Sequence, residues 1–235
     1  MFMVHLCRQD ITGEETDKMK KMISLVLIAS ILLISMGSVF AATVPGMVYT
    51  DHTAQEMDAI LRNAGVKDVK PMDWYAQGTA SLLEAGLIAP DSNGNINPLS
   101  TATAGDAVSL ITKALGIANK TDTPSIVLQK AKDAGLIEAG VATSTEMKRI
   151  DAAKLLAKAF NMSYISVYNK RLFPFEDFYA FTPDERGMVR ALNERGLFLG
   201  YAIGGGKYEF RPNNIITKGE LYTLIARLIA FSLTA

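Results

Sequence analysis

Apolar residues recur at helical spacing in three stretches, each led by an acidic residue. Counted from Asp106, Asp151 and Glu220, the apolar positions are i+1, i+4, i+5, i+8 and i+9, which share one face of a helix. The residues are Ala107, Leu110, Ile111, Ala114 and Leu115; Ala152, Leu155, Leu156, Ala159 and Phe160; and Leu221, Leu224, Ile225, Leu228 and Ile229. The pattern predicts three buried helices.

Another helix is expected before each of these stretches. Gly86, Gly135 and Gly196 each precede Leu and then Ile or Phe, and each follows a helical pattern. The upstream positions eight, seven and four residues before each glycine are Gly78, Thr79 and Leu82; Val127, Leu128 and Ala131; and Met188, Val189 and Leu192. A helix C-cap in the left-handed region favours glycine, since a side chain there costs about 1 kcal/mol.

The pattern therefore predicts a helix-loop-helix unit that occurs three times. The units lie near residues 64–118, 122–162 and 173–232. Residues 42–63 precede them and contain a further helix, signalled by Thr53 and Glu56 as a capping box and by Gly65 as its stop. Two helices cannot bury their own apolar faces, so the three units are expected to share one core.

The N-terminal region is typical of an export signal. A basic Met19-Lys20-Lys21 precedes an uncharged run over residues 22–40, and cleavage is predicted after Ala41. A single-pass anchor is the alternative, because the run approaches the roughly 20 residues of a spanning helix. Residues 1–18 are polar and acidic, which favours Met19 as the true start. The only cysteine, Cys7, would then be absent from the mature chain, which could form no disulfide.

The composition is that of a globular protein without a dominant charge. The 235 residues are 49% hydrophobic and 20% charged, and Lys plus Arg equals Asp plus Glu at 24 each. No global field attracts nucleic acid or a membrane surface, so neither is an expected partner of the mature chain. Recognition by charge must be local.

Two segments carry motifs of a known family. The first unit reads "VKDVKPMDWYAQGTASLLEAGLI", with Asp68, Val69 and Trp74, and the third reads "FEDF" followed later by "FRPNNIITKGE". These motifs resemble the S-layer homology family, whose modules read Phe-x-Asp-Val, Trp-Ala, Gly-Ile, Phe-Arg-Pro and Thr-Arg-Ala-Glu. Phe175 and Asp177 match the first of these in the third unit.

The chain also departs from the family pattern. The sequences that replace Thr-Arg-Ala-Glu are Thr103-Ala104-Gly105-Asp106, Lys148-Arg149-Ile150-Asp151 and Thr217-Lys218-Gly219-Glu220. Only one of the three keeps the arginine. The second unit lacks the Asp-Val and Trp segment, and the third has Asp184 at the Trp position.

The resemblance implies a mainly α fold, in which three modules form a pseudo-threefold prism with a central helical bundle and grooves between neighbours. It implies a secreted bacterial cell-wall protein that binds anionic polysaccharide linked to peptidoglycan, needs no cofactor and is not an enzyme. Other surface-layer proteins are a second class of partner. The alternative is a degenerate scaffold for protein interactions that has lost glycan binding. A hydrolase of wall glycan is a third hypothesis.

Arg149 and Lys218 are the leading glycan-binding candidates. Each stands in the first turn of a helix, where a cation opposes the helix dipole, so a reason beyond helix stability is expected. Free backbone N–H groups at such helix N-termini also suit carboxylate or phosphate. The nearby threonines and acids, Thr217 with Glu220 and Thr103 with Asp106, are interpreted as caps.

Four further residues complete the predicted glycan site, each with a structural alternative. Trp74 can stack on a pyranose ring, although a tryptophan at an apolar helix start is more often a core residue. Arg211 can contact an anion or brace its loop. Asp68 and Asp177 can contact the glycan or accept backbone N–H bonds of a loop.

Other chemistry finds no support. "DSNGN" has calcium-loop spacing, yet it lacks glycine at the sixth position, and Ala102 replaces the bidentate glutamate. "GGGKYEF" lacks the Gly-Lys-Ser/Thr of a phosphate loop. His52 is the only histidine after residue 41, so a histidine metal cluster is excluded and no Ser-His-Asp set is supported.

Overall fold

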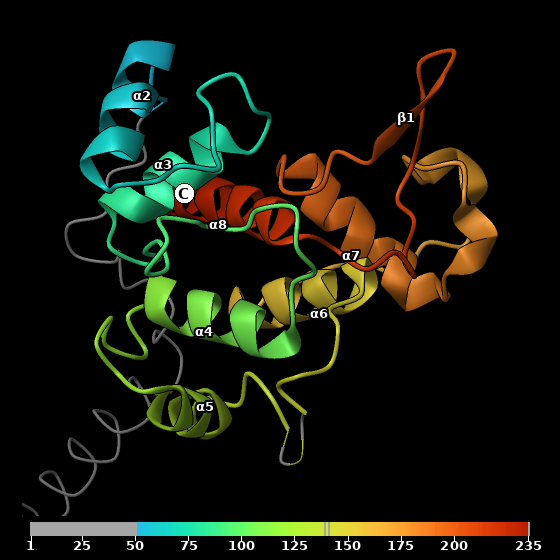
Figure 1. Cartoon of the computed structure of the whole chain (residues 1–235). Helices are drawn as coiled ribbons and strands as arrows, with labels where there is room; N and C mark the ends of the chain where they lie inside the picture. The colour runs from blue at the N-terminus through green and yellow to red at the C-terminus, as the bar shows by residue number, and fades with distance from the viewer. Residues whose placement is uncertain (1–50, 139, 141, 235) are drawn as a thin grey trace, which may run out of the picture. The chain divides into compact units, whose positions relative to one another are not determined.

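The computed structural model describes residues 51–138, 140 and 142–234, and this part of the chain is mainly α-helical, as predicted (Figure 1). The α-helices are α2 (Ala54–Asn63), α3 (Ala76–Glu84), α4 (Ala104–Ala114), α5 (Pro124–Asp133), α6 (Arg149–Ala159), α7 (Pro183–Glu194) and α8 (Lys218–Thr234). Two 3₁₀ turns, η1 (Lys170–Leu172) and η2 (Phe178–Ala180), precede α7.

The predicted export signal, including Cys7, Met19 and the cleavage position at Ala41, lies outside the described residues. Within the part that the structure covers, none of the helices combines the length and the apolar character that crossing a membrane would require.

The predicted helix boundaries agree with the structure. Capping boxes begin α2 at Thr53 and Glu56 and begin α4 at Thr103 and Asp106. Gly86, Gly135 and Gly196 follow α3, α5 and α7 with φ angles of 63°, 68° and 71°, the left-handed conformation expected of helix stops.

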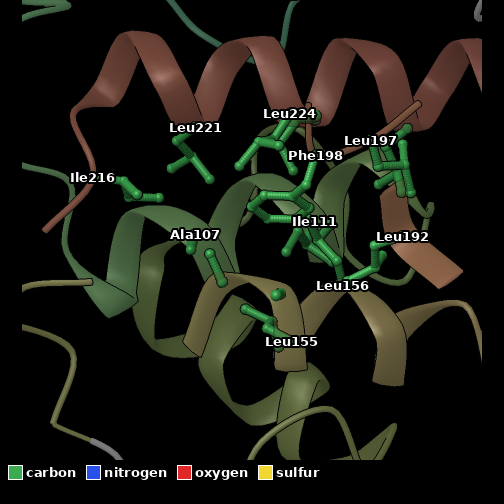
Figure 2. Packing of buried hydrophobic residues seen from close by; sticks show 14 of the residues in the cluster. Ala107, Ile111, Leu155, Leu156, Leu192, Leu197, Phe198, Ile216, Leu221 and Leu224 are labelled. Carbon is green, nitrogen blue, oxygen red and sulfur yellow. The ribbon is translucent and has the colours of Figure 1, made fainter. Parts of the chain in front are cut away.

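The core lies between α4, α6 and α8, whose apolar faces turn toward one another. Ile111 of α4, Leu156 of α6 and Leu224 of α8 are buried in one cluster (Figure 2). Three further helices cover this core in a cyclic order, because α5 packs on α4, α7 packs on α6, and α3 packs on α8, while α2 packs on α3. The first helix of the first unit therefore contacts the last helix of the third.

A closed ring of backbone hydrogen bonds joins the segments that lead into α4, α6 and α8. Met147 donates to the carbonyl of Ala102 over 2.9 Å, Ala102 donates to Ile216 over 2.9 Å, and Ile216 donates to Met147 over 3.0 Å. Each is the second residue before the start of its helix. Equivalent residues of the three units are thus linked in a cycle.

The loop of the third unit differs from the simple connection expected from sequence. It forms an antiparallel hairpin of β1 (Tyr201–Gly204) and β2 (Lys207–Glu209), in which Tyr201 faces Glu209. Phe198 and Phe210 flank the hairpin, and their rings pack with centroids 5.2 Å apart. This packing fixes the base of the hairpin beside α6 and α8.

Candidate functional site

A pocket of about 560 Å³ lies where the three units meet, and we call it the α8 pocket. The first unit supplies Trp74, the second supplies Arg149, and the third supplies residues of the hairpin and of α8. The third-unit residues are Leu199, Gly200, Tyr201, Glu220, Thr223, Leu224 and Arg227. Two predicted glycan-binding residues, Trp74 and Arg149, are therefore brought together from distant parts of the sequence.

Arg149 forms the floor of the α8 pocket and is only 6% exposed. Its guanidinium carbon lies 5.0 Å from the ring centroid of Phe198, 4.6 Å from that of Tyr201 and 5.1 Å from that of Phe210. Burial lowers the pKa of this guanidinium, although an arginine stays charged in any ordinary condition. Its Nε is buried without a hydrogen-bond partner in the described part of the chain.

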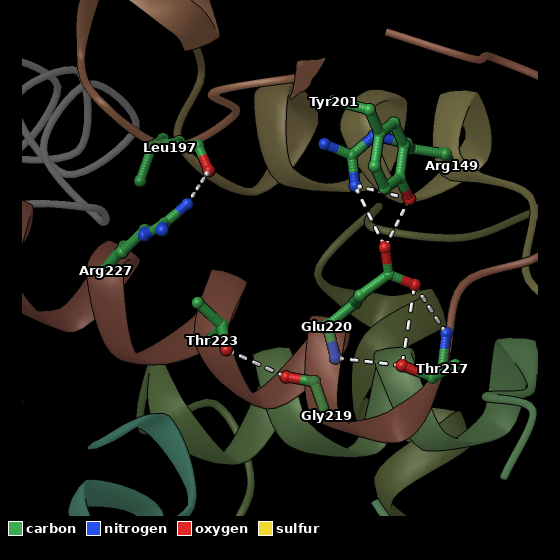
Figure 3. Close-up of polar contacts among 8 residues, drawn as sticks. All are labelled: Arg149, Leu197, Tyr201, Thr217, Gly219, Glu220, Thr223 and Arg227. Atoms are coloured by element: carbon green, nitrogen blue, oxygen red, sulfur yellow. Dashed lines mark hydrogen bonds and ion pairs between the residues drawn. The ribbon is translucent and has the colours of Figure 1, made fainter. Parts of the chain in front are cut away.

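Glu220 is the counterion of Arg149 and also the cap of α8. Its Oε1 lies 3.6 Å from Nη1 of Arg149 and accepts a hydrogen bond from the Tyr201 hydroxyl (Figure 3). Its Oε2 accepts the backbone N–H of Thr217 over 2.9 Å. The capping interpretation of Thr217 and Glu220 is thus confirmed, and the same carboxylate has a second role that the sequence did not indicate.

Tyr201 makes the stability of the fold sensitive to alkaline pH. Burial first, and then the hydrogen bond with Glu220, raises the pKa of Tyr201 to about 12, against about 10 in an unfolded chain. Because the folded state holds this proton more tightly, its contribution is complete below about pH 10 and is lost as the pH approaches about 12.

We therefore expect the free energy of unfolding to fall over this range and to fall less steeply in Tyr201→Phe. Urea titrations at stepped pH measure this. Some slope should persist in the variant, because burial also raises the pKa of Tyr222 to about 12. An unchanged slope in Tyr201→Phe would contradict the assignment.

Trp74 lies at the mouth of the α8 pocket. The indole is 59% exposed and packs edge-on against Tyr75, with ring centroids 5.1 Å apart. The expectation that a tryptophan here belongs to the core is wrong, because Tyr75 takes the buried position and leaves the indole outside. An exposed aromatic ring and a buried cation that line one pocket are suited to a sugar ring that carries an anionic group.

Asp68 and Asp177 have equivalent bracing positions in the first and third units. Asp68 accepts the backbone N–H groups of Ile96 and Asn97 over 2.9 and 2.7 Å. Asp177 accepts those of Phe210 and Arg211 over 3.0 and 2.8 Å. In both carboxylates each oxygen accepts a loop N–H, which is the structural alternative considered for these residues, and neither residue lines the α8 pocket.

Arg211 also has a bracing geometry. Its backbone is left-handed, with φ at 59°, and its Nε lies 3.0 Å from Oε2 of Glu209. Its guanidinium carbon is 4.9 Å from the ring centroid of Tyr201. Arg211 therefore supports the hairpin residue that forms one wall of the α8 pocket.

Lys218 lies apart from the α8 pocket, and the N-termini of α4, α6 and α8 do not offer the free N–H groups expected from sequence. Lys218 begins α8 but is not among the residues lining the α8 pocket. The expected free N–H groups are occupied by loop carbonyls, and this expectation is wrong. The first two donors of each helix bond over 2.7–3.0 Å: Ala104 to Thr145, Gly105 to Thr143, Arg149 to Asn214, Ile150 to Pro212, Lys218 to Ser100 and Gly219 to Pro98.

Four residues were not predicted from the sequence to line the pocket. Three of them, Glu220, Thr223 and Arg227, lie at i, i+3 and i+7 of α8, so this spacing could have identified Thr223 and Arg227 as one lining face with Glu220. Tyr201 carried no such signal, because its position depends on the hairpin.

A different pocket, of about 550 Å³, lies between α4 and α5. Asp106, Ser109, Ser125 and Thr143 are among its lining residues, and the lining includes no cation and no aromatic ring. The α8 pocket is therefore the better candidate for an anionic sugar.

Comparison with known proteins agrees with the predicted resemblance. Residues 67–108 match the S-layer homology domain, a segment that includes Asp68, Trp74 and the start of α4. Over 181 residues, or 71% of the chain, the sequence is 27% identical to the surface-layer 125 kDa protein of Lysinibacillus sphaericus. The chain spans about 15% of the length of that relative.

Proposed function

Because residues 67–108 carry an S-layer homology sequence, we propose that the chain is an exported, non-enzymatic cell-wall-anchoring protein. It binds anionic polysaccharide linked to peptidoglycan, and the α8 pocket is its binding site. The three units near residues 64–118, 122–162 and 173–232 act as S-layer homology modules. The observation that carries the proposal is that one pocket is lined by both the buried cation Arg149 and the exposed ring of Trp74.

The arrangement suits a carboxylate-bearing sugar for electrostatic reasons. Arg149 and Glu220 are 3.6 Å apart, which is longer than a normal charge-assisted hydrogen bond. A guanidinium has five N–H donors, so a ligand carboxylate can bind Arg149 while Glu220 stays in place. The buried rings of Phe198 and Phe210 pack against the guanidinium and keep water from that side of it, which strengthens this attraction.

Arg227 adds a second guanidinium to the same pocket. Its Nη1 donates to the carbonyl of Leu197 over 3.4 Å, and its charge is close enough to contribute to the lowered pKa of Arg149. A ligand anion between the two cations would relieve their repulsion. Charge-assisted hydrogen bonds contribute about 1.5–3 kcal/mol each, so three contacts approach the roughly 8 kcal/mol of a micromolar complex.

Sedimentation with peptidoglycan sacculi tests the proposal. We expect the purified chain to sediment with sacculi that retain their polysaccharide and to stay in solution with acid-stripped sacculi. Trp74→Ala should weaken binding about tenfold through the lost sugar contact, which equals about 1.4 kcal/mol. Lys120→Ala, an exposed lysine outside the α8 pocket, is the control.

For the buried Arg149 we choose a substitution that conserves the charge. Arg149→Lys keeps a charge opposite Glu220 but removes the planar donor fork, so binding should weaken while the fold is retained. Combined with Trp74→Ala, it should abolish sedimentation. Equal sedimentation with stripped sacculi, or wild-type binding by both Trp74→Ala and Arg149→Lys, would overturn the proposal.

A protein-interaction scaffold is the second candidate. It is favoured by the exposed apolar side chains of Ile165, Tyr168 and Tyr179 in the segment that joins α6 to α7, because interaction surfaces often expose large apolar groups. Under this function the variants of Trp74 and Arg149 would leave association with other surface proteins unchanged.

A further inference from the structure

We propose that residues 51–97 exchange between two copies of this chain, so that α3 of one copy packs on α8 of the other. In the exchanged pair, each α8 pocket combines Trp74 of one copy with Arg149 and Glu220 of the other. The inference goes beyond the proposed function, because it concerns association of the protein with itself and requires no sugar.

The packing partner of α3 belongs to the far end of the described chain. α3 packs on α8, whereas α4, the next helix after α3, packs on α5, α6 and α8 (Figure 1). A Cβ at Gly78 would lie 2.9 Å from Cα of Thr223, and a Cβ at Gly219 would lie 3.0 Å from that of Tyr75. These close approaches fix the register of α3 on α8. The α8 of a second copy offers the same surface.

Residues 51–97 are held together as one segment. α2 packs on α3. The N–H of Lys67 donates to the carbonyl of Gly94 over 2.8 Å. Asp68 accepts the N–H groups of Ile96 and Asn97 over 2.9 and 2.7 Å. The loop that follows α3 is therefore fastened, as far as Asn97, to the residues that precede α3.

The residues directly after Asn97 are bound to α8 instead. The carbonyl of Pro98 accepts the N–H of Gly219 over 2.7 Å, and that of Ser100 accepts the N–H of Lys218 over 2.9 Å. The two segments therefore meet at the peptide bond between Asn97 and Pro98, which we call the hinge. Ser100 donates its N–H to the carbonyl of Asn97 over 3.1 Å and closes a turn there.

The hinge has a strained backbone. Asn97 is left-handed, with φ at 55°, and it precedes a proline, which favours an extended backbone at the residue before it. A residue other than glycine keeps such a conformation only where the surrounding structure holds it. Release of residues 51–97 lets Asn97 become extended. Short hinges under strain favour exchange of a segment between identical chains.

The closed chain and the exchanged pair contain the same contacts between α3 and α8, so their balance depends on the hinge and on concentration. A tethered segment has a local concentration on the order of millimolar. The exchanged pair therefore accumulates where copies are crowded, as on a surface that holds many of them. Under the proposed function, such a pair has two α8 pockets and binds a repeating polymer with higher avidity.

Cross-linking of mixed chains tests the exchange. Trp74 and Leu199 line the α8 pocket, are 59% and 51% exposed, and belong to the two segments that the hinge joins. One chain carries Trp74→Cys and the other Leu199→Cys, both with Cys7→Ser, which removes the only native thiol. The two chains are unfolded in urea and refolded together at about 1 mM, where association competes with closure. A flexible bismaleimide then cross-links them.

We expect size exclusion to show a fraction of twice the monomer mass, and denaturing gels of this fraction to show covalent dimers. Exchange brings the two substituted positions, from different copies, into one pocket. Each chain refolded alone should give the same fraction without cross-links, because its thiols then lie in separate pockets. Refolding at about 1 μM should leave monomers, since closure is then strongly favoured.

A hinge variant tests the cause of the exchange. Asn97→Gly with Pro98→Ala relieves the strain and keeps the contact of α3 with α8. The yield of covalent dimer should fall at least about tenfold, since every pair contains two hinges. Asn161→Gly is the matched control, because Asn161 is also left-handed, with φ at 46°, but follows α6. This control should leave the yield unchanged, and circular dichroism checks the fold of each variant.

The inference is overturned by any of three results. They are a chain that stays monomeric after refolding at about 1 mM, covalent dimers that form equally when each chain is refolded alone, and a yield that the hinge variant does not lower. No sugar is present in these measurements. Their failure leaves the proposed function standing, and a failure to sediment with sacculi leaves the exchange standing.

Discussion

Glu220→Ala is expected to lower the free energy of unfolding by about 3–5 kcal/mol, the usual cost of removing one partner of a buried ion pair. Arg149, which is 6% exposed and packs against aromatic rings, would then be a buried charge without its counterion. The substitution also removes the acceptor of the Tyr201 hydroxyl and the capping contact with Thr217. Urea unfolding followed by circular dichroism measures the change.

Two variants separate the causes of this loss. Thr217→Ala removes only the cap and should cost about 1 kcal/mol. Arg149→Met with Glu220→Ala removes both charges, so part of the stability should return, because a well-packed apolar pair can replace a buried ion pair. If Glu220→Ala were no more destabilising than Thr217→Ala, the carboxylate would be a cap alone.

Gly187→Ala should destabilise the protein by about 1–3 kcal/mol, although alanine is intrinsically the better helix former by about 1 kcal/mol. The added Cβ would meet the backbone of Ile165, at 2.8 Å from its carbonyl carbon and 3.2 Å from the nitrogen of Ser166. Backbone atoms cannot rotate away, so α7 and the segment around Ile165 must separate. Thermal unfolding measures the cost.

Glu194→Ala in the same helix is the matched control. Its carboxylate makes an exposed i, i+4 pair with Arg190 over 2.7 Å, which contributes about 0.3–0.5 kcal/mol. A Gly187→Ala protein as stable as this control, or more stable, would show that the segment moves without cost. The close approach would then not fix the position of this segment.

The helices were predictable because their signals are local. Capping residues such as Thr53 and Thr103, the glycine stops, and the apolar stripes all act within a few residues of the structure they determine. The hairpin at Tyr201 was not predicted. Its position depends on packing between Phe198 and Phe210 and on α6, which is distant in sequence.

The sequence predicted which residues form the candidate site better than it predicted what each of them does. The sequence singled out Arg149 and Trp74, and the structure brings them to one pocket. It gave no sign that the cation would be buried and the indole exposed, because these depend on rings from the third unit and on Tyr75. The N–H groups at the N-termini of α4, α6 and α8 were expected to be free. Their acceptors are loop carbonyls of neighbouring units, and such distant contacts leave no local signal in the sequence.

The cyclic hydrogen bonds through Ala102, Met147 and Ile216 set a limit on the order of folding. During synthesis α3 emerges long before α8, the helix on which it packs. A nascent chain therefore cannot cover the apolar face of α3 until the third unit has left the ribosome. Such dependence on distant partners slows folding and keeps this part of the polypeptide open until the third unit has been synthesised.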